Sequence, residues 1–99
     1  MRLRKMKFDE RLFLDIDLNS LLTLLVVYRE QGVTKAAGRL EVHQPAVSNT
    51  LAKLRCYFCD PLFTRHCRTL LPTPKATEIV KRLEPALLEI QKVLMAAAN

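Results

Sequence analysis

Residues 34–58 constrain the fold of this 99-residue chain more than any other segment. Thr34 is a good N-cap for a short helix over residues 35–40, and Gln44-Pro45 favours the start of a second helix because proline suits the first helical position. A tight turn over residues 41–43 is left between them. The second helix, over residues 44–58, carries one apolar stripe, formed by Ala46, Val47, Leu51, Leu54 and Phe58. This layout is that of a helix-turn-helix, whose second helix enters the DNA major groove by its N-terminal end.

Another helix precedes this motif. Asp17 is placed to cap a helix over residues 18–31, and Gly32 can take the left-handed conformation that ends it. Its apolar residues recur at steps of three and four: Leu18, Leu21, Leu22, Leu25 and Val26. The chain has only two glycines, which argues against a sandwich or barrel, and its 49% of apolar residues is ordinary for a globular protein. Residues 1–16 have no clean period and predict a basic arm, with a short helix as the alternative.

A basic hairpin is expected after the motif. Asp60-Pro61 ends the second helix, and residues 62–72 contain two short extended candidates around a tip at 66–68. The strand signal is modest because the tip lacks Asn-Gly or Asp-Gly. With Arg65, His66 and Arg68, this hairpin is read as a wing whose arginine enters the narrow minor groove. The alternative is a surface hairpin with solvated arginines.

The end of the chain, residues 75–98, predicts a long helix with a heptad seam. About 23 residues make a rod of about 35 Å, which one small domain cannot cover, so a partner helix is expected. Pro85 should kink the rod or divide it into two shorter helices. The residues that we assign to dimerisation are Ile79, Leu83, Ala86, Leu87, Ile90, Val93 and Leu94. The chain thus divides into an arm (1–16), a winged helix-turn-helix (17–74) and a dimerisation helix (75–99).

The polar residues of the motif suit double-stranded DNA. Gln44 can donate and accept at once, which matches the edge of adenine. Ser48 and Asn49 lie one turn later on the same face, and the ring of Pro45 could touch a thymine methyl group. Phosphate contacts are expected from Lys53 and from the start of the preceding helix, at Thr34 and Lys35. For Gln44, Ser48 and Asn49, the alternative is a capping and solvent-facing role. For Thr34, the alternative is a role as N-cap alone.

The charge distribution favours a polyanion as partner. The chain carries a net charge of +6, and residues 34–75 hold seven Lys/Arg against Glu41 and Asp60, a net charge of +5. One rival is a helical module that binds another protein through its heptad seam, with an incidental basic face. Another is a binder of RNA or single strands, but the chain has only two Tyr and four Phe to supply stacking surfaces.

Residues 17–74 resemble the N-terminal domain of the LysR-type transcriptional regulators. The matching segments are Asp17-Leu18-Asn19 with its following leucines, Val33-Thr34-Lys35-Ala36-Ala37-Gly38-Arg39-Leu40, Gln44-Pro45-Ala46-Val47-Ser48-Asn49 with Leu51 and Leu54, Asp60-Pro61-Leu62-Phe63-Thr64-Arg65, and Pro72-Thr73. The resemblance implies a mainly α, three-helix winged helix-turn-helix with a two-stranded wing, followed by a linker helix that pairs antiparallel in a homodimer. It implies that Gln44, Pro45, Ser48 and Asn49 face the major groove and that Arg68 reaches the minor groove.

The sequence departs from the family pattern at four positions: His43, Asn49, Cys59 and Ala76. Of these, Asn49 replaces a common arginine, which would change the base that is read. The family's larger effector-binding domain lies outside this sequence, so the resemblance assigns no small-molecule site to these residues.

The remaining chemistry is sparse, and no cofactor or resident metal is expected. Three cysteines suggest thiols in a reducing, cytoplasmic compartment, buried or half-buried and inert. A zinc site from Cys56, Cys59, His66 and Cys67, or a redox function of the thiols, is the alternative. His43 and His66 gather no nucleophile or carboxylate at motif spacing, so we expect no enzyme. No apolar run is long enough to span a membrane.

Overall fold

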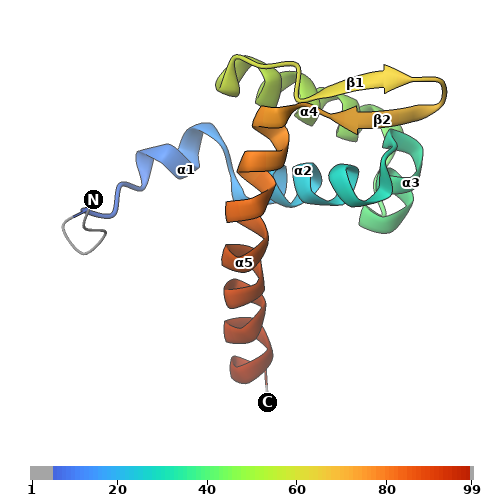
Figure 1. The fold of residues 1–99 in the computed structure, drawn as a ribbon. Coiled ribbons are helices and arrows are strands. Elements are labelled where there is room, and N and C mark those ends of the chain that lie inside the picture. Colours follow the sequence, from blue (N-terminus) through green and yellow to red (C-terminus); the bar gives the residue numbers. More distant parts are fainter. Residues whose placement is uncertain (1–5, 99) are drawn as a thin grey trace.

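Helices α2 (Leu18–Glu30), α3 (Val33–Leu40) and α4 (Gln44–Phe58) cross around one core in the computed structural model, which describes residues 6–98 (Figure 1). A two-stranded antiparallel hairpin, β1 (Phe63–His66) and β2 (Thr69–Pro72), follows α4 and extends past α3. Helix α5 (Pro74–Ala97) then runs away from the other elements. This confirms the expected mainly α, winged class.

The core is formed by the inner faces of α2, α3 and α4, the base of the hairpin and the first turns of α5. It contains Leu24, Leu25, Val27, Ala36, Ala37, Val47, Leu51, Leu54, Leu62, Phe63, Leu70, Ala76 and Val80. Ala36 and Ala37 are small, which lets α3 approach its neighbours closely. Of the expected apolar stripe on α4, Val47, Leu51 and Leu54 are buried and Phe58 is half-buried, whereas Ala46 is exposed.

The junction between α2 and α3 differs from the sequence expectation. Asp17 caps α2 as expected, because its Oδ1 accepts a hydrogen bond of 2.7 Å from the Ser20 amide. The left-handed residue is Gln31 (φ 57°), however, whereas Gly32 is extended and caps α3. Thr34 therefore lies inside α3 and is not its N-cap. A tertiary bond accounts for the shift, since the Leu70 amide of β2 donates to the Gln31 carbonyl at 3.0 Å and holds that residue in place.

The start of α4 follows the expected pattern. The turn over residues 41–43 contains a left-handed residue, Glu41 (φ 57°), and α4 begins at Gln44 with Pro45 in its first turn. The side chain of His43, the N-cap residue, makes no capping hydrogen bond. The first turn of α4 is thus organised by the turn backbone and the proline ring.

The strands differ by one residue from the sequence expectation, because β1 begins and ends one residue later than residues 62–65 and β2 extends one residue past residues 69–71. Phe63 pairs with Pro72 and His66 pairs with Thr69, which leaves Cys67 and Arg68 as a two-residue tip. Cys67 has a φ of 57°, as a tight hairpin turn requires at one or both of its central residues. The residues Cys67 and Arg68 are therefore unusual for a two-residue tip, but the left-handed backbone of Cys67 is usual for a tight hairpin turn.

Helix α5 continues through Pro85 without interruption, so the expected division into two helices is wrong. The proline removes only one hydrogen bond, to the carbonyl of Lys81. Lys81 and Pro85 are both exposed, so that carbonyl lies on the solvent side of the rod. Thr73 begins the helix, because its Oγ1 accepts from the Ala76 amide at 3.1 Å.

At the N-terminus, the alternative of a short helix is confirmed. Helix α1 spans Arg11–Asp15 and projects away from the core, on the side opposite the hairpin (Figure 1). Among residues 6–16, only Ile16 is buried, and Leu12, Phe13 and Leu14 are exposed. The basic residues Arg2, Arg4 and Lys5 of the expected arm lie outside the described residues. Within residues 6–98, no helix combines the length and the apolar character needed to cross a bilayer.

Candidate nucleic-acid interface

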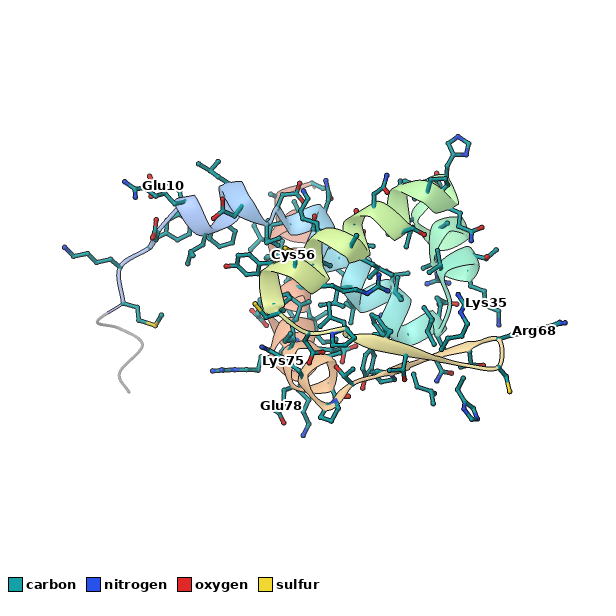
Figure 2. The ribbon with its side chains drawn as sticks, turned by 90° about the horizontal axis from the view of Figure 1, so that it is seen from above. Glu10, Lys35, Cys56, Arg68, Lys75 and Glu78 are labelled. Atoms are coloured by element: carbon teal, nitrogen blue, oxygen red, sulfur yellow. The ribbon has the colours of Figure 1, made fainter. Side chains whose placement is uncertain are left out.

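Five of the nine residues expected to contact DNA line one hollow of about 300 Å³. They come from three separate elements: Thr34 and Lys35 from α3, Gln44 from the start of α4, and Arg65 and Arg68 from the hairpin. We call this concavity the α3–wing hollow. Figure 2 shows Lys35 and Arg68 at the same end of the molecule, beside the outer part of the hairpin. Packing thus places three cationic side chains around Gln44, the residue for which the sequence analysis predicts a contact with a base.

The α3–wing hollow also contains one acidic residue that the sequence analysis missed. Glu30, the last residue of α2, lines it, and its Oε2 lies 3.9 Å from Nε of Arg39. This ion pair partly neutralises the only carboxylate among the lining residues. Glu30 is separated by several residues from every motif position, so only the packing of α2 against α3 reveals it.

The first two turns of α4 present a polar, exposed face. Gln44, Pro45, Ser48 and Asn49 are all exposed, and positions separated by three or four residues share one side of a helix. No hydrogen bond or ion pair within residues 6–98 engages the side chains of Gln44, Ser48 or Asn49. Their donors and acceptors are therefore not used by the fold.

Lys53 lies in a different environment. It lines a second hollow, of about 430 Å³ between α2 and α4, together with Asp17, Asn19, Thr23 and Thr50. The amide and hydroxyl of Ser20 lower the pKa of the Asp17 carboxyl, and the charge of Lys53 adds a smaller effect in the same direction. Lys53 therefore extends the basic surface along α4, away from the hairpin. Asn19, Thr23 and Thr50 had no sequence signal, because only the crossing of α2 and α4 brings them beside Lys53.

The two arginines of the hairpin are exposed on its outer part. Arg65 is opposite Leu70 in the strand register, and Arg68 is in the two-residue tip. Neither guanidinium makes an ion pair with a described residue. The hairpin is anchored by two buried residues, Phe63 at its base and Leu70 in the second strand, so the arginines project from an anchored element.

The three cysteines are exposed, so the expectation of buried or half-buried thiols is wrong. The sequence suggested burial because free cysteine is among the most buried residue types, but Cys56 and Cys59 at the end of α4 are both exposed. Among the described residues, no group of three His, Cys, Asp or Glu side chains gathers closely enough to hold a metal ion. Cys56 and Cys59 are at the end of α4 whereas Cys67 is at the hairpin tip, so the alternative zinc site does not assemble.

The residues assigned to dimerisation fall into two groups. Ile79, Leu83 and Leu87 are half-buried against the core of the same chain. Ala86, Ile90, Val93 and Leu94 are exposed, with exposed fractions of 38% for Ile90 and 66% for Leu94. Leu87, Ile90 and Leu94 line an open groove of about 860 Å³ between α2 and α5, which also contains Leu18, Leu22, Leu25 and Val26. We call it the α2–α5 groove.

Comparison with known proteins identifies related sequences. The family model described as bacterial regulatory helix-turn-helix protein, lysR family, matches residues 18–77. Nodulation protein D 2 of Bradyrhizobium sp. (strain NC92) is 42% identical over 84 residues, which are 85% of this chain and 25% of that protein. Nodulation protein D 1 of Rhizobium meliloti (strain 1021) is also 42% identical over 84 residues, 85% of this chain and 27% of that protein. The chain thus spans about a quarter of the length of these relatives.

Solved structures share the fold. A probable transcriptional regulator of Pseudomonas aeruginosa, PA0477, superposes with a TM-score of 0.79 at 32% identity, over 85% of this chain and 28% of that chain. The BenM_DBD in complex with catB site 1 DNA superposes with a TM-score of 0.76 at 24% identity, over 84% of this chain and 93% of that chain. Each likeness covers more than four fifths of this chain.

Proposed function

Because the chain belongs to the lysR family of bacterial regulatory helix-turn-helix proteins, we propose that it binds double-stranded DNA sequence-specifically, as the DNA-binding part of a transcriptional regulator. It acts through binding and not through catalysis, at the nucleoid in the cytoplasm. The observation that carries this proposal is the α3–wing hollow, where Lys35, Arg65 and Arg68 surround Gln44.

The roles of the residues follow from their positions. The exposed first turns of α4 enter the major groove, where Gln44 reads an adenine edge and Ser48 and Asn49 reach a base or a phosphate. Pro45 contacts a thymine methyl group. Thr34 and Lys35, in the first turn of α3, contact phosphate, where the positive end of the helix dipole adds to the attraction.

Two further elements extend the contact. Lys53, farther along α4 and beside the hollow between α2 and α4, contacts the DNA phosphate backbone. Arg65 and Arg68 place the wing against the minor groove, whose narrow form attracts arginine. This arrangement accounts for cationic side chains on both sides of an uncharged reading face.

A homodimer through α5 completes the proposal. A helix of 24 residues is about 36 Å long, and its C-terminal half leaves Ile90, Val93 and Leu94 exposed. The α2–α5 groove offers apolar surface for the α5 of a second copy, in the antiparallel arrangement that is typical of the family. A two-fold dimer presents two copies of α4 to successive turns of the duplex.

Selection of bound duplexes from a random pool tests the proposal. We expect enrichment of an interrupted, roughly palindromic site with half-sites separated by whole helical turns. On that site, log affinity should fall linearly with log salt, with a slope of about −0.9 per phosphate contact. Binding to a helical protein partner with little salt dependence, and no enriched duplex, would instead support the interaction module.

A further inference from the structure

Two exposed thiols lie three residues apart at the C-terminal end of α4, and neither the proposed DNA contact nor the dimer uses them. Cys56 is in the last turn, and Cys59 is the residue that caps the helix. The Cys59 thiol donates to the Cys56 carbonyl oxygen over 3.6 Å, so its side chain points back along the helix toward Cys56. In Figure 2, Cys56 lies well away from Lys35 and Arg68.

We propose that Cys56 and Cys59 form a reversible disulfide by exchange with a low-molecular-weight disulfide such as glutathione disulfide. Residues three apart on a helix have Cβ atoms about 5–6 Å apart, and a disulfide needs Cβ atoms about 3.5–4.5 Å apart. Inside a helix the two Cβ atoms would therefore have to approach by about 1–2 Å. Cys59 is not held to this helical spacing, because it lies past the last residue of α4 in a left-handed conformation (φ 54°).

The exchange proceeds in two balanced steps. One cysteine thiolate attacks a sulfur of glutathione disulfide, which forms a mixed disulfide and releases one glutathione thiolate. The second cysteine thiolate then attacks the protein sulfur of the mixed disulfide and releases the other glutathione. The two cysteines lose their protons and are oxidised, and one glutathione disulfide is reduced to two glutathione molecules.

The surroundings of the pair favour this reagent. Arg55 donates from Nε to the Pro61 carbonyl at 3.0 Å, and Lys75 donates from Nζ to the Phe58 carbonyl at 2.7 Å. Two cationic side chains are thus held at the same helix end, and glutathione disulfide is an anion at neutral pH. Cys67 is in the hairpin tip, on a different element, and is not the partner.

Closing the disulfide acts on the junction between α4, the hairpin and α5. The last turn of α4 is held by the Cys59 amide, which donates to the Cys56 carbonyl at 3.3 Å, and by the Asp60 amide, which donates to the Arg55 carbonyl at 3.2 Å. The backbone shift that closes the disulfide changes the geometry of both bonds. The Asp60 carboxylate in turn holds Leu62 at the base of the hairpin. Oxidation should therefore loosen this junction.

Peptide mapping of the folded chain tests the proposal. After incubation with glutathione disulfide, blocking of remaining thiols and digestion with trypsin, cleavage at Arg55 and Arg65 releases residues 56–65, which contain Cys56 and Cys59 and no other cysteine. We expect this peptide to be unblocked and about 2 Da lighter than its reduced form, because two hydrogen atoms are lost. Dithiothreitol should restore it.

Two variants serve as controls. Cys67→Ser should leave the oxidised peptide unchanged, and Cys59→Ser should abolish the internal disulfide. Peptides that carry glutathione on both cysteines, or cross-linked chains as the main product, would overturn the proposal. Amide hydrogen exchange at Asp60 and Leu62 should accelerate on oxidation in the wild type and not in Cys59→Ser. Unchanged exchange in a fully oxidised sample would reject the effect on the junction.

Discussion

Oδ2 of Asp60 lies 2.7 Å from Oγ1 of Thr73, and these two residues join the end of α4 to the start of α5. The same Asp60 oxygen accepts from the Leu62 amide at 2.8 Å, while Thr73 Oγ1 accepts from the Ala76 amide at 3.1 Å. The Thr73 amide also donates to the Leu62 carbonyl at 2.8 Å. One short network therefore fixes the end of α4, the base of the wing and the start of α5 relative to one another.

Thr73→Ala should destabilise the fold, because it removes both the N-cap of α5 and the donor to Asp60. Loss of an N-cap typically lowers the free energy of unfolding by about 1 kcal/mol. Thr73→Ser keeps a hydroxyl and should retain most of the stability of the wild type. Urea denaturation measures the difference. Thr64→Ala, on the exposed side of β1, is the matched control and should change the free energy of unfolding little. An equal loss in both variants would show that the network contributes no more than an exposed threonine.

Stability should fall on acidification because two aspartates have lowered pKa values in the folded chain. The hydroxyl of Thr73 and then the amide of Leu62 lower the pKa of Asp60, and the amide of Ser20 lowers that of Asp17, both from an ordinary value of 3.8. Such a group stabilises the fold above its unfolded pKa, and this contribution is lost as the pH falls through the folded pKa. Melting temperatures should therefore be level at neutral pH and decline below about pH 4.

Asp60→Asn should reduce the fall in melting temperature at acidic pH, because the asparagine side chain does not titrate. Glu78→Gln, an exposed change on α5 whose side chain makes no hydrogen bond with a described residue, is the control. If the melting temperatures of Asp60→Asn and Glu78→Gln fall by the same amount between neutral and acidic pH, the Asp60 network does not contribute to the acid sensitivity.

Local patterns in the sequence predicted the helices but not the bonds that set their ends. The steps of apolar residues locate α2 and α4 closely, because amphipathic period and capping act within a few residues. Gln31, and not Gly32, is left-handed because of a bond from Leu70, which is far along the chain. The pair of Asp60 and Thr73 is equally non-local. The continuity of α5 through Pro85 depends on its exposure, which a sequence pattern does not fix.

The candidate site shows the same difference between local patterns, which the sequence reveals, and non-local packing, which it does not. Gln44, Pro45, Ser48 and Asn49 are recognisable because they begin one helix and share one face. The convergence of Lys35 with Arg68 depends on how the hairpin packs beside α3, and the position of Lys53 beside Asp17 depends on the crossing of α2 and α4. The exposure of Cys56 and Cys59 was mispredicted because the general tendency of free cysteine to be buried does not reveal which side of a helix end a residue occupies.

Gln44→Ala should relax base preference at one position of the selected site. Loss of a bidentate contact costs about 1–3 kcal/mol on that site and little on random duplex, where no base is read. Competition binding with both duplexes measures the contrast. His43→Ala, the neighbouring exposed residue outside the helix, is the control for nonspecific disturbance of the turn. Equal losses on specific and random duplex for Gln44→Ala would reject its role as a base reader.

Lys53→Ala should weaken binding to all duplexes alike and reduce the slope of log affinity against log salt by about 1, the value for one phosphate contact. Lys81→Ala removes the same charge from the exposed surface of α5 and should leave the slope unchanged. Binding titrations at several salt concentrations give both slopes. A slope for Lys53→Ala equal to that of the wild type would show that the charge beside Asp17 does not contact DNA.

Ile90→Asp should disrupt the dimer. Ile90 is 38% exposed and lines the α2–α5 groove with Leu87 and Leu94, so a carboxylate there would be buried without a partner in an antiparallel pair of α5 helices. Lys81→Asp is the matched control because, at 3.6 residues per turn, it faces the opposite side of α5. Sedimentation velocity should show a concentration-dependent dimer for the wild type and Lys81→Asp, and a monomer for Ile90→Asp. Circular dichroism should show equal helix content in all three. A folded Ile90→Asp variant with an unchanged dimer would place the interface elsewhere, and half-site spacing would then no longer be set by α5.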